Sequence, residues 1–295
     1  MRTSIAGEPV IISPGRAARP SDFRPGGKQR CPFCPGNESD TPPEVFALRD
    51  SGTADEAGWS VRVVPNLYPV FSADPSAPAY GRHEVIIDTP DHQAEFADLP
   101  SEQIARCLTT YQARLQAARL DPRLAYASVF KNHGEGAGAS RQHAHSQLMA
   151  TTFVPPRVAR ESQALTPEEN IVLSGKSIHA VTPPASRFPF ELAVGPASPK
   201  SAFEDSAASV VQELASVISS LLSAMNRILD RPDYHLMVCT APFRAENRDR
   251  YRWRVEIVPR LTNVAGFEWA SGVFVNQHSP AAAAEQYRSA LGNQP

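Results

Sequence analysis

The sequence predicts an α+β fold built from a duplicated unit, in which helices pack on antiparallel sheets. A helical pattern followed by two strand-like runs occurs at residues 101–149 and again at residues 210–258. The run His-x-His-x-Gln at 143–147 is answered by Arg-x-Arg-x-Glu at 252–256, an offset of 109 residues (254 minus 145). A chain of 295 residues with 42% hydrophobic content is long enough to bury the core of such a fold.

The first copy is preceded by an irregular arm that is rich in Pro and Gly. Runs rich in β-branched residues and bounded by turn residues predict strands at 10–12, 60–64 and 84–88. Ser101 can cap a helix, because Ile104, Leu108, Tyr111 and Leu115 recur at helical spacing behind it. Two further strands are expected on either side of a Gly-rich loop, at 126–130 and 143–149.

The second copy repeats this order. Apolar residues at helical spacing predict a helix over 210–228, and strands are expected at 234–239 and 253–258. A short helix should begin at Ser279-Pro280. We therefore divide the chain into an N-terminal unit, a polar linker and a C-terminal unit, at residues 1–156, 157–187 and 188–295.

The balance of charge argues against long nucleic acid as a partner. The chain has 29 Lys and Arg against 31 Asp and Glu, without a basic block of the kind that follows a phosphate backbone. No run approaches the roughly 18 consecutive apolar residues of a membrane span, and residues 1–8 lack the apolar core of a signal peptide. We expect a protein of the cytoplasm that does not use a membrane.

The chemistry is expected on the strand at 143–149, where alternate side chains share a face. His143, His145 and Gln147 would then project together, and a largely neutral histidine can attack phosphorus to give a labile phosphoramidate. The loop at 134–140 can bring backbone N–H groups and the Ser140 hydroxyl to an anion. On these residues alone, a metal site or a hydrogen-bonded core pair explains the two histidines equally well.

Cys31 and Cys34 form a Cys-x-x-Cys pair that can supply two of the four ligands of a tetrahedral zinc ion. His92 and His143 are the candidates for the other two. A redox pair or two ordinary thiols are the alternatives, and the Pro- and Gly-rich flanks do not resemble the strand-to-helix setting of a redox motif. Cys107 and Cys239 lie alone in apolar runs and are expected in the core.

Several motifs occur together in a fixed order, and this order is more specific than any one of them. They occupy residues 13–20, 31–38, 65–69, 89–92 and 138–147. With these motifs the chain resembles the galactose-1-phosphate uridylyltransferase family of the histidine-triad superfamily, including its ADP-glucose phosphorylase branch. The resemblance extends over roughly residues 8–290.

The resemblance implies that Cys31, Cys34, His92 and His143 bind Zn²⁺, and that His145 is the nucleophile. Gln147 and Ser140 would contact the transferred phosphate, and Gln147 favours transfer over hydrolysis, because hydrolase branches usually place a third histidine there. The positions implied to hold the phosphates, the base and ribose, and the hexose are Arg16, Arg19, Gly138, Asn66, Tyr68, Phe130, Asn132 and Glu268.

The implied activity is transfer of a nucleoside monophosphate between a nucleotide sugar and a hexose 1-phosphate, in a homodimer in which Arg16 or Arg19 reaches the neighbouring site. Two alternatives remain. The first is an ADP-glucose phosphorylase that uses inorganic phosphate, which is favoured by Leu67 where the uridylyltransferases carry aspartate, and by Ala139 where they carry cysteine. The second is a catalytically idle module that binds zinc and nucleotide.

A second metal site is not expected, because Arg252 and Arg254 occupy positions where relatives often have histidines, and a guanidinium does not ligate metals. The two arginines are expected to bind an anion, to pair with Glu191 or Glu256, or to lie on the surface. The histidines without motif support receive no site role: His83, His133, His179, His235 and His278.

Overall fold

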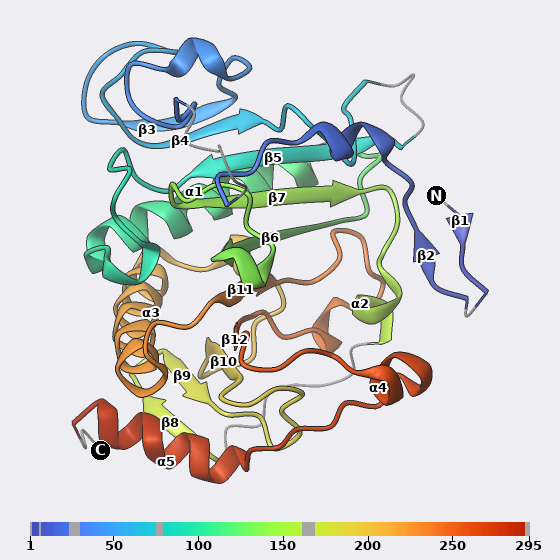
Figure 1. Cartoon of the computed structure of the whole chain (residues 1–295), viewed down its shortest axis with the longest axis vertical. Helices are drawn as coiled ribbons and strands as arrows, with labels where there is room; N and C mark the ends of the chain where they lie inside the picture. Colours follow the sequence, from blue (N-terminus) through green and yellow to red (C-terminus); the bar gives the residue numbers. More distant parts are fainter. Residues whose placement is uncertain (1, 6, 24–29, 75–78, 161–168, 293–295) are drawn as a thin grey trace.

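A ten-stranded antiparallel sheet forms the centre of the computed structural model, which describes residues 2–5, 7–23, 30–74, 79–160 and 169–292 (Figure 1). Its strand order is β3-β4-β5-β7-β6-β11-β12-β10-β9-β8, and a separate two-stranded sheet pairs β1 with β2. The strands are β1 (Arg2–Thr3), β2 (Pro9–Val10), β3 (Phe46–Arg49), β4 (Trp59–Pro65), β5 (Gly81–Ile87), β6 (Tyr126–His133), β7 (His145–Thr151), β8 (Ile171–Ser174), β9 (Ile178–Val181), β10 (Leu192–Pro196), β11 (Tyr234–Cys239) and β12 (Arg254–Pro259). The helices are α1 (Ser101–Arg119), α2 (Pro156–Arg160), α3 (Ala208–Leu229), α4 (Gly266–Ser271) and α5 (Pro280–Ala290).

The order of the strands contains the expected duplication. One half uses β5, α1, β6 and β7, and the other uses β10, α3, β11 and β12, with mirrored positions in the sheet. The halves join where β6 pairs with β11, so that both contribute to one continuous sheet. β7 begins at His145 and β12 begins at Arg254, at the offset read from the sequence. The predicted α+β class with duplicated units is confirmed.

The long helices form because their apolar residues fall on one side. Ile104, Leu108, Tyr111 and Leu115 of α1 are fully buried, and α1 packs on β4, β6, β7 and α3. Helix α3 contacts β9, β10 and α5 in the same way. In length and composition α3 could also cross a membrane, but half of its most apolar window is buried inside the fold, as in a core helix.

Two expectations of local structure need correction. β7 begins at His145, so His143 lies in the preceding connection and not on the strand. Of the strand expected at 10–12, only Val10 belongs to a strand, β2. The range 157–187, expected to link the two units, contains most of α2 together with β8 and β9, while its residues 161–168 lie outside the described part.

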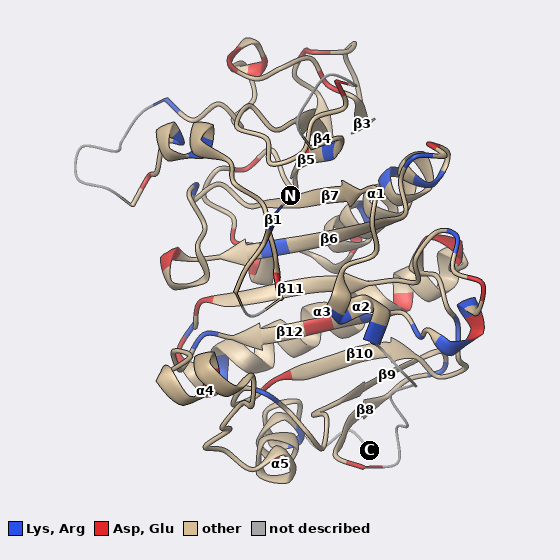
Figure 2. Cartoon of the chain, turned by 90° about the vertical axis from the view of Figure 1, so that its right-hand side faces the viewer, with Lys and Arg blue, Asp and Glu red and all other residues tan. Residues whose placement is uncertain are grey.

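Basic and acidic residues are interspersed along the elements (Figure 2). In the second half, several of them meet at the buried carboxylate of Glu256 on β12. Arg254 lies 2.6 Å from this carboxylate, and Arg157 and Arg187 each lie 2.8 Å from it. Burial alone would raise the pKa of Glu256, but the three guanidinium groups lower it to about 2. The expected pairing of Arg254 with Glu256 is confirmed, whereas Arg252 donates to backbone carbonyls of the nearby connection.

This cluster predicts loss of stability in acid. The pKa of Glu256 is about 2 in the fold against an ordinary 4.5, so its contribution is complete above pH 4.5 and is lost as pH falls toward 2. We expect the free energy of unfolding to decrease over that interval. Glu256→Gln should flatten this decrease and, by leaving the partly exposed Arg187 and Arg254 without their carboxylate, cost about 2 kcal/mol near neutral pH.

Urea unfolding at a series of pH values measures both effects, with the exposed Glu285→Gln as the matched control. An acid-induced decrease that is equally steep in Glu256→Gln would contradict this role of Glu256.

Candidate functional site

Two cysteines and two histidines from three separate connections meet in space. The ligand atoms of Cys31, Cys34, His92 and His143 all lie within 4.8 Å of one another. Cys31 and Cys34 precede β3, His92 follows β5, and His143 precedes β7. The structure therefore contains a cluster that can hold a metal ion, made of the four residues expected from the sequence.

The spacing inside the cluster fits a tetrahedral ion. The two Nδ1 atoms of His92 and His143 are 3.3 Å apart, and sulfur-to-Nδ1 distances run from 3.4 to 3.7 Å. A tetrahedron with bonds of about 2.0–2.3 Å has edges of about 3.3–3.8 Å. The Nε2–H of His143 donates to the carbonyl of Thr89 at 2.8 Å, which leaves Nδ1 free as the ligand.

A cation in this cluster would stabilise its thiolates. Burial, helped by repulsion from Cys34, raises the pKa of the Cys31 thiol to about 11. A thiol in this position stays protonated unless a positive charge stabilises the thiolate, and a bound metal ion supplies that charge.

His145 is the first residue of β7 and is 7% exposed. Its Nδ1–H donates to the carbonyl of His143 at 2.9 Å, so Nε2 keeps an unshared electron pair. Burial, followed by repulsion from Lys131, lowers the pKa of His145 to about 4. The imidazole is therefore neutral at neutral pH, the form in which it can act as a nucleophile.

A buried network of hydrogen bonds fixes the start of β7. The Lys131 ammonium donates to the carbonyl of His145 and to the carboxylate of Asp88, both at 2.9 Å. Ser146 Oγ donates to the same carboxylate at 2.9 Å, and the Tyr111 hydroxyl lies 2.6 Å from Ser146 Oγ. These contacts fix the backbone that carries His145.

Gln147 follows His145 on the same face of β7 and is 6% exposed. Three neighbouring cavities open around these side chains, with volumes of about 630, 370 and 90 Å³. The largest of the three contains Gln147 and the intermediate one contains His145, while the narrowest is lined by both. Every predicted catalytic or substrate-binding residue except Glu268 lines at least one of them: Arg16, Arg19, Asn66, Tyr68, Phe130, Asn132, Gly138, Ser140, His145 and Gln147.

The cavities are positively charged on one side. Arg16 donates to the carbonyl of Tyr68 at 2.7 Å, and burial together with repulsion from Arg16 and Arg141 lowers the pKa of Arg19. Arg141 is paired with Asp22 at 2.7 Å, but within the described residues no carboxylate pairs with Arg16 or Arg19. Two cations are therefore available to a phosphate in the same chain as His145.

The Gly-rich loop differs from its expected form. The N–H groups of Gly138 and Ala139 donate within the loop, at 2.8 and 3.0 Å, and that of Gly136 donates to Asp233 at 2.6 Å. Gly134 has φ +81°, and a Cβ there would lie 1.7 Å from the Asp233 carboxylate. These three N–H groups already donate to acceptors within the protein. Of the predicted cradle, Ser140 is the residue that lines two of the neighbouring cavities.

Glu268 is the one predicted substrate-binding residue that lies elsewhere. Its carboxylate accepts hydrogen bonds from the N–H groups of Ala265 and Val275, at 2.7 and 3.1 Å, and so shapes α4 and the segment after it. α4 lies beside the second half of the sheet (Figure 1). Within one chain, Glu268 is not brought to the cavities around His145.

Several residues of the site were not identified from the sequence. Phe33 lies between the two cysteines, and its ring centroid is 5.5 Å from that of His145. His83 on β5 lies 3.0 Å from the Gln147 amide oxygen, and Lys131 and Asp88 form the network behind β7. His83 lies just before the strand predicted at 84–88, and only the observed pairing of β5 with β7 brings it to Gln147.

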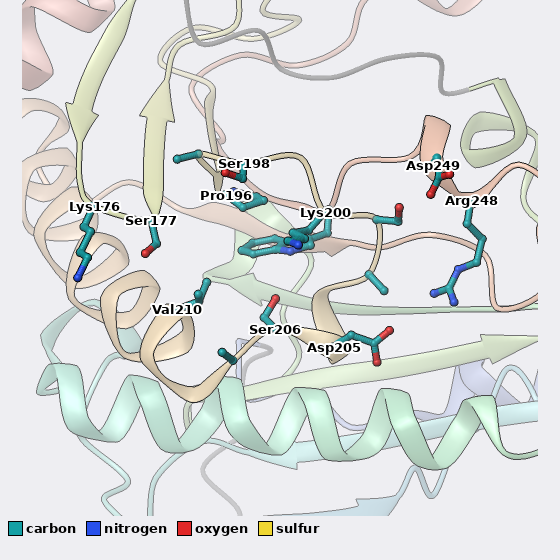
Figure 3. Close-up of a pocket in the computed structure, with 15 residues that line it drawn as sticks. Lys176, Ser177, Pro196, Ser198, Lys200, Asp205, Ser206, Val210, Arg248 and Asp249 are labelled. Carbon is teal, nitrogen blue, oxygen red and sulfur yellow. The ribbon is translucent and has the colours of Figure 1, made fainter.

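A larger cavity of about 710 Å³ lies near the start of α3. Figure 3 shows its side chains spread along it, with Lys176 and Arg248 at opposite sides and Lys200 between them. Because these charges do not converge, we assign the chemistry to the cavities around His145.

Comparison with known proteins identifies the family. Residues 12–155 match the model of the N-terminal domain of galactose-1-phosphate uridyl transferase. An ADP-glucose phosphorylase of Arabidopsis thaliana is 31% identical over 92% of this chain and 87% of its own. The chain belongs to the galactose-1-phosphate uridylyltransferase family. A galactose-1-phosphate uridylyltransferase of Thermotoga maritima is 24% identical over 95% of this chain and 94% of its own.

Solved structures agree with this assignment. A crystal structure of an ADP-glucose phosphorylase from Arabidopsis thaliana with bound ADP-glucose is 30% identical, with a TM-score of 0.82 over 94% of this chain and 93% of that one. A uridylyltransferase structure is 25% identical, with a TM-score of 0.82 over 100% of this chain and 99% of that one. As a member of the galactose-1-phosphate uridylyltransferase family, the chain is a nucleotidyltransferase.

The metal cluster predicts a loss of stability on chelation. Because the four ligands tie three connections together, removing the ion should lower the melting temperature, and Cys31→Ser should lower it similarly and abolish metal binding. Elemental analysis and thermal melting measure the two effects. Cys239→Ser, outside the cluster, should retain the metal. An unchanged melting curve after verified removal of the metal would exclude a structural ion.

Proposed function

We propose that this protein transfers a nucleoside monophosphate from a nucleotide sugar to a second phosphate-bearing acceptor through a nucleotidyl-His145 intermediate. The observation that carries the proposal is the free Nε2 electron pair of His145 beside Gln147 and Ser140, in cavities that also contain Arg16 and Arg19. The bound ADP-glucose of the Arabidopsis structure supports a nucleotide sugar as the donor.

In the first step, Nε2 of His145 attacks the phosphorus that is bonded to the nucleoside. An N–P bond forms as the P–O bond to the distal phosphate breaks, and the electron pair leaves with the sugar 1-phosphate. The positive charge that the ring acquires is stabilised at Nδ1–H by the carbonyl of His143. The Gln147 amide can donate to a non-bridging oxygen, since its nitrogen is free of hydrogen bonds within the described residues.

In the second step, a phosphate oxygen of the acceptor attacks the same phosphorus and the N–P bond breaks. The electron pair returns to Nε2, so the chemistry requires no general base. This agrees with an amide at Gln147, which cannot remove a proton from water. Transfer to an anionic acceptor is therefore favoured over hydrolysis.

The narrow cavity of about 90 Å³ suits a flat base. Phe33, Val64, Leu67 and Val85 line it, and it opens toward His145. Leu67 supplies apolar surface where the well-known uridylyltransferases carry aspartate, so it removes a polar contact to the base or ribose. The pocket supports nucleotide binding without restricting it to uracil.

Zinc is the proposed ion of the cluster formed by Cys31, Cys34, His92 and His143. Two thiolates and two imidazoles in a tetrahedral arrangement are the ligand set that zinc prefers. Such an ion would fix the connection that contains Phe33 and the one that contains His143. Cytoplasmic location belongs to the same proposal, because the two thiols must stay reduced to bind metal.

A specific observation favours a second candidate, phosphorolysis of ADP-glucose with inorganic phosphate as the acceptor. The Arabidopsis ADP-glucose phosphorylase is 31% identical, compared with 24% for the Thermotoga uridylyltransferase. Leu67 is in accord with this candidate. The two candidates share the mechanism on His145 and differ in base and acceptor.

The intermediate is directly testable. Incubation with ADP-glucose or UDP-glucose should add one nucleoside monophosphate to the intact mass, and His145→Ala should abolish this addition. Gln147→Ala should slow it by about 100-fold, because a donor to the transferred phosphate is lost. His179→Ala, on β9, is the matched control and should react like the wild type.

Inorganic phosphate, glucose 1-phosphate or galactose 1-phosphate is then added to the isolated adduct. The acceptor is the compound that removes the nucleoside monophosphate from the protein fastest. Tight nucleotide binding without any adduct would instead support an idle binding module.

The homodimer is also proposed, and an exposed apolar surface supports it. We define the C-terminal apolar surface by its residues Leu261, Phe267, Trp269, Val273, Phe274 and Val275, which are 41–77% exposed. Large exposed apolar patches mark interaction sites. Because this surface surrounds Glu268, a second copy docked here could bring that carboxylate to the cavities of its neighbour, as a hexose contact requires.

Disrupting this surface should separate the subunits. We expect the wild type to sediment as a dimer and Phe267→Asp/Trp269→Glu to sediment as a monomer with the wild-type melting temperature, since both side chains are exposed within one chain. Leu120→Glu changes another exposed apolar residue, 84% exposed, and should remain dimeric. A monomeric wild type, or a dimer that survives the double change, would contradict this interface.

The division into units at 1–156, 157–187 and 188–295 also stays a proposal. The mirrored order of strands supports two units, while β8 and β9 extend the sheet of the second one.

A further inference from the structure

His83 lies where the connection between β4 and β5 meets β7, the strand that carries Gln147. It belongs to β5, is 4% exposed, and its ring contacts residues of both segments. The backbone N–H of Val70 is 3.0 Å from Nδ1, while the amides of Asn66 and Gln147 lie 3.1 and 3.0 Å from Nε2. No step of the proposed mechanism uses this ring.

The tautomer of His83 follows from Val70. A backbone N–H can only donate, so Nδ1 must accept, and the neutral ring therefore carries its hydrogen on Nε2. Burial lowers the pKa of His83 to about 4, which keeps the ring neutral at neutral pH. Nε2–H then donates to Oε1 of Gln147.

This tautomer determines the orientation of the Gln147 amide. Oε1 must face His83, so the two amide hydrogens on Nε2 are directed away from it, and Gln147 lines the cavities on either side. With the amide reversed, the buried Nε2–H of His83 would lose Oε1 as its acceptor, and the neighbouring Asn66 nitrogen cannot replace it because it is also a donor.

The Asn66 amide is fixed in a related way. Its Oδ1 accepts from the N–H of Tyr68 at 2.8 Å, so the nitrogen at 3.1 Å from His83 is a second donor. Two donors cannot bond to each other, which leaves the Asn66 hydrogens for other acceptors. Asn66 lines the same narrow cavity as Gln147. Both amides therefore present N–H groups to an anionic or polar ligand.

We infer that His83 is a positioning residue that fixes the Gln147 amide with its N–H groups toward the transferred phosphate. The inference rests on the proposed function, because it assigns His83 a task in forming the nucleotidyl enzyme. Without His83, the Gln147 amide rotates between two orientations, and only one of them offers a donor to the phosphate.

A matched pair of substitutions separates this task from a structural one. Asparagine places a carbonyl near the position of Nδ1, so His83→Asn can still accept from Val70 but cannot reach Gln147. Glutamine is longer and places an N–H near the position of Nε2, so His83→Gln can still donate to Gln147. A positioning role predicts slow adduct formation in His83→Asn and near wild-type formation in His83→Gln, whereas anchoring of Val70 alone predicts the reverse.

The experiment measures the rate constant of nucleotidyl-enzyme formation at saturating nucleotide sugar, by rapid quench and intact mass. We expect His83→Asn and His83→Ala to be about 10- to 100-fold slower than the wild type, and His83→Gln to be within about threefold. In a Gln147→Ala background, His83→Ala should slow the reaction by less than about threefold, because the group through which it acts is gone. Melting temperatures verify that each variant is folded.

Two results would overturn the positioning role while the proposed function stands. The first is that the His83→Ala and Gln147→Ala substitutions reduce the rate of adduct formation additively in the double mutant. The second is that His83→Asn reacts faster than His83→Gln. A wild type that forms no adduct with any nucleotide sugar overturns both. If His83→Ala does not fold, the comparison of His83→Asn with His83→Gln decides the question by itself.

Discussion

The carboxylate of Asp88 is buried between β5, β6, β7 and α1, and it accepts hydrogen bonds from Lys131, Ser146 and Tyr111. Its own backbone carbonyl accepts from Gln103 at 2.7 Å. A charge without solvent must be paired and hydrogen-bonded, and here each of the surrounding elements supplies a partner. The start of β7 is thereby held in place, while the cluster of Cys31, Cys34, His92 and His143 lies at the connection just before it. His145, the proposed nucleophile, lies between these two groups of contacts.

The two halves share a framework and differ in what they carry at equivalent places. Gln147 pairs with Phe130, Phe130 with Met237, and Met237 with Glu256, so the two polar residues lie in one row of the sheet and on one face. In the first half, the row presents a neutral amide to a cavity. In the second half, a carboxylate is enclosed by Arg157, Arg187 and Arg254. In the first copy this row lines a cavity, whereas in the second copy its carboxylate is used in ion pairs that link neighbouring segments.

The sequence predicted those parts of the fold that depend on local periodicity. The buried face of α1 and the 109-residue offset between His145 and Arg254 can both be read without coordinates. Local periodicity did not reveal β8 and β9, because a polar, Pro-bearing stretch looks like a connection until neighbouring strands pair with it. For the site, the order of motifs gave the four members of the metal cluster. His83 was missed because its importance lies in a contact with the adjacent strand. The bond from the Gly136 N–H to Asp233 could not be foreseen, because Asp233 lies almost 100 residues away in the sequence.

That contact with Asp233 has a consequence for the biogenesis of the protein. Gly136 in the Gly-rich loop donates to Asp233, and β6 pairs with β11, so both the loop and the innermost strand of the first half are completed by residues that the ribosome adds about 100 positions later. Until those residues emerge, β6 has an unpaired edge that invites association with other chains. In the nascent first half, the loop at 134–140 lacks the partner that Gly136 has in the complete fold. A chain that stops after β7 would therefore carry both an unpaired strand edge and an incompletely supported loop next to His145.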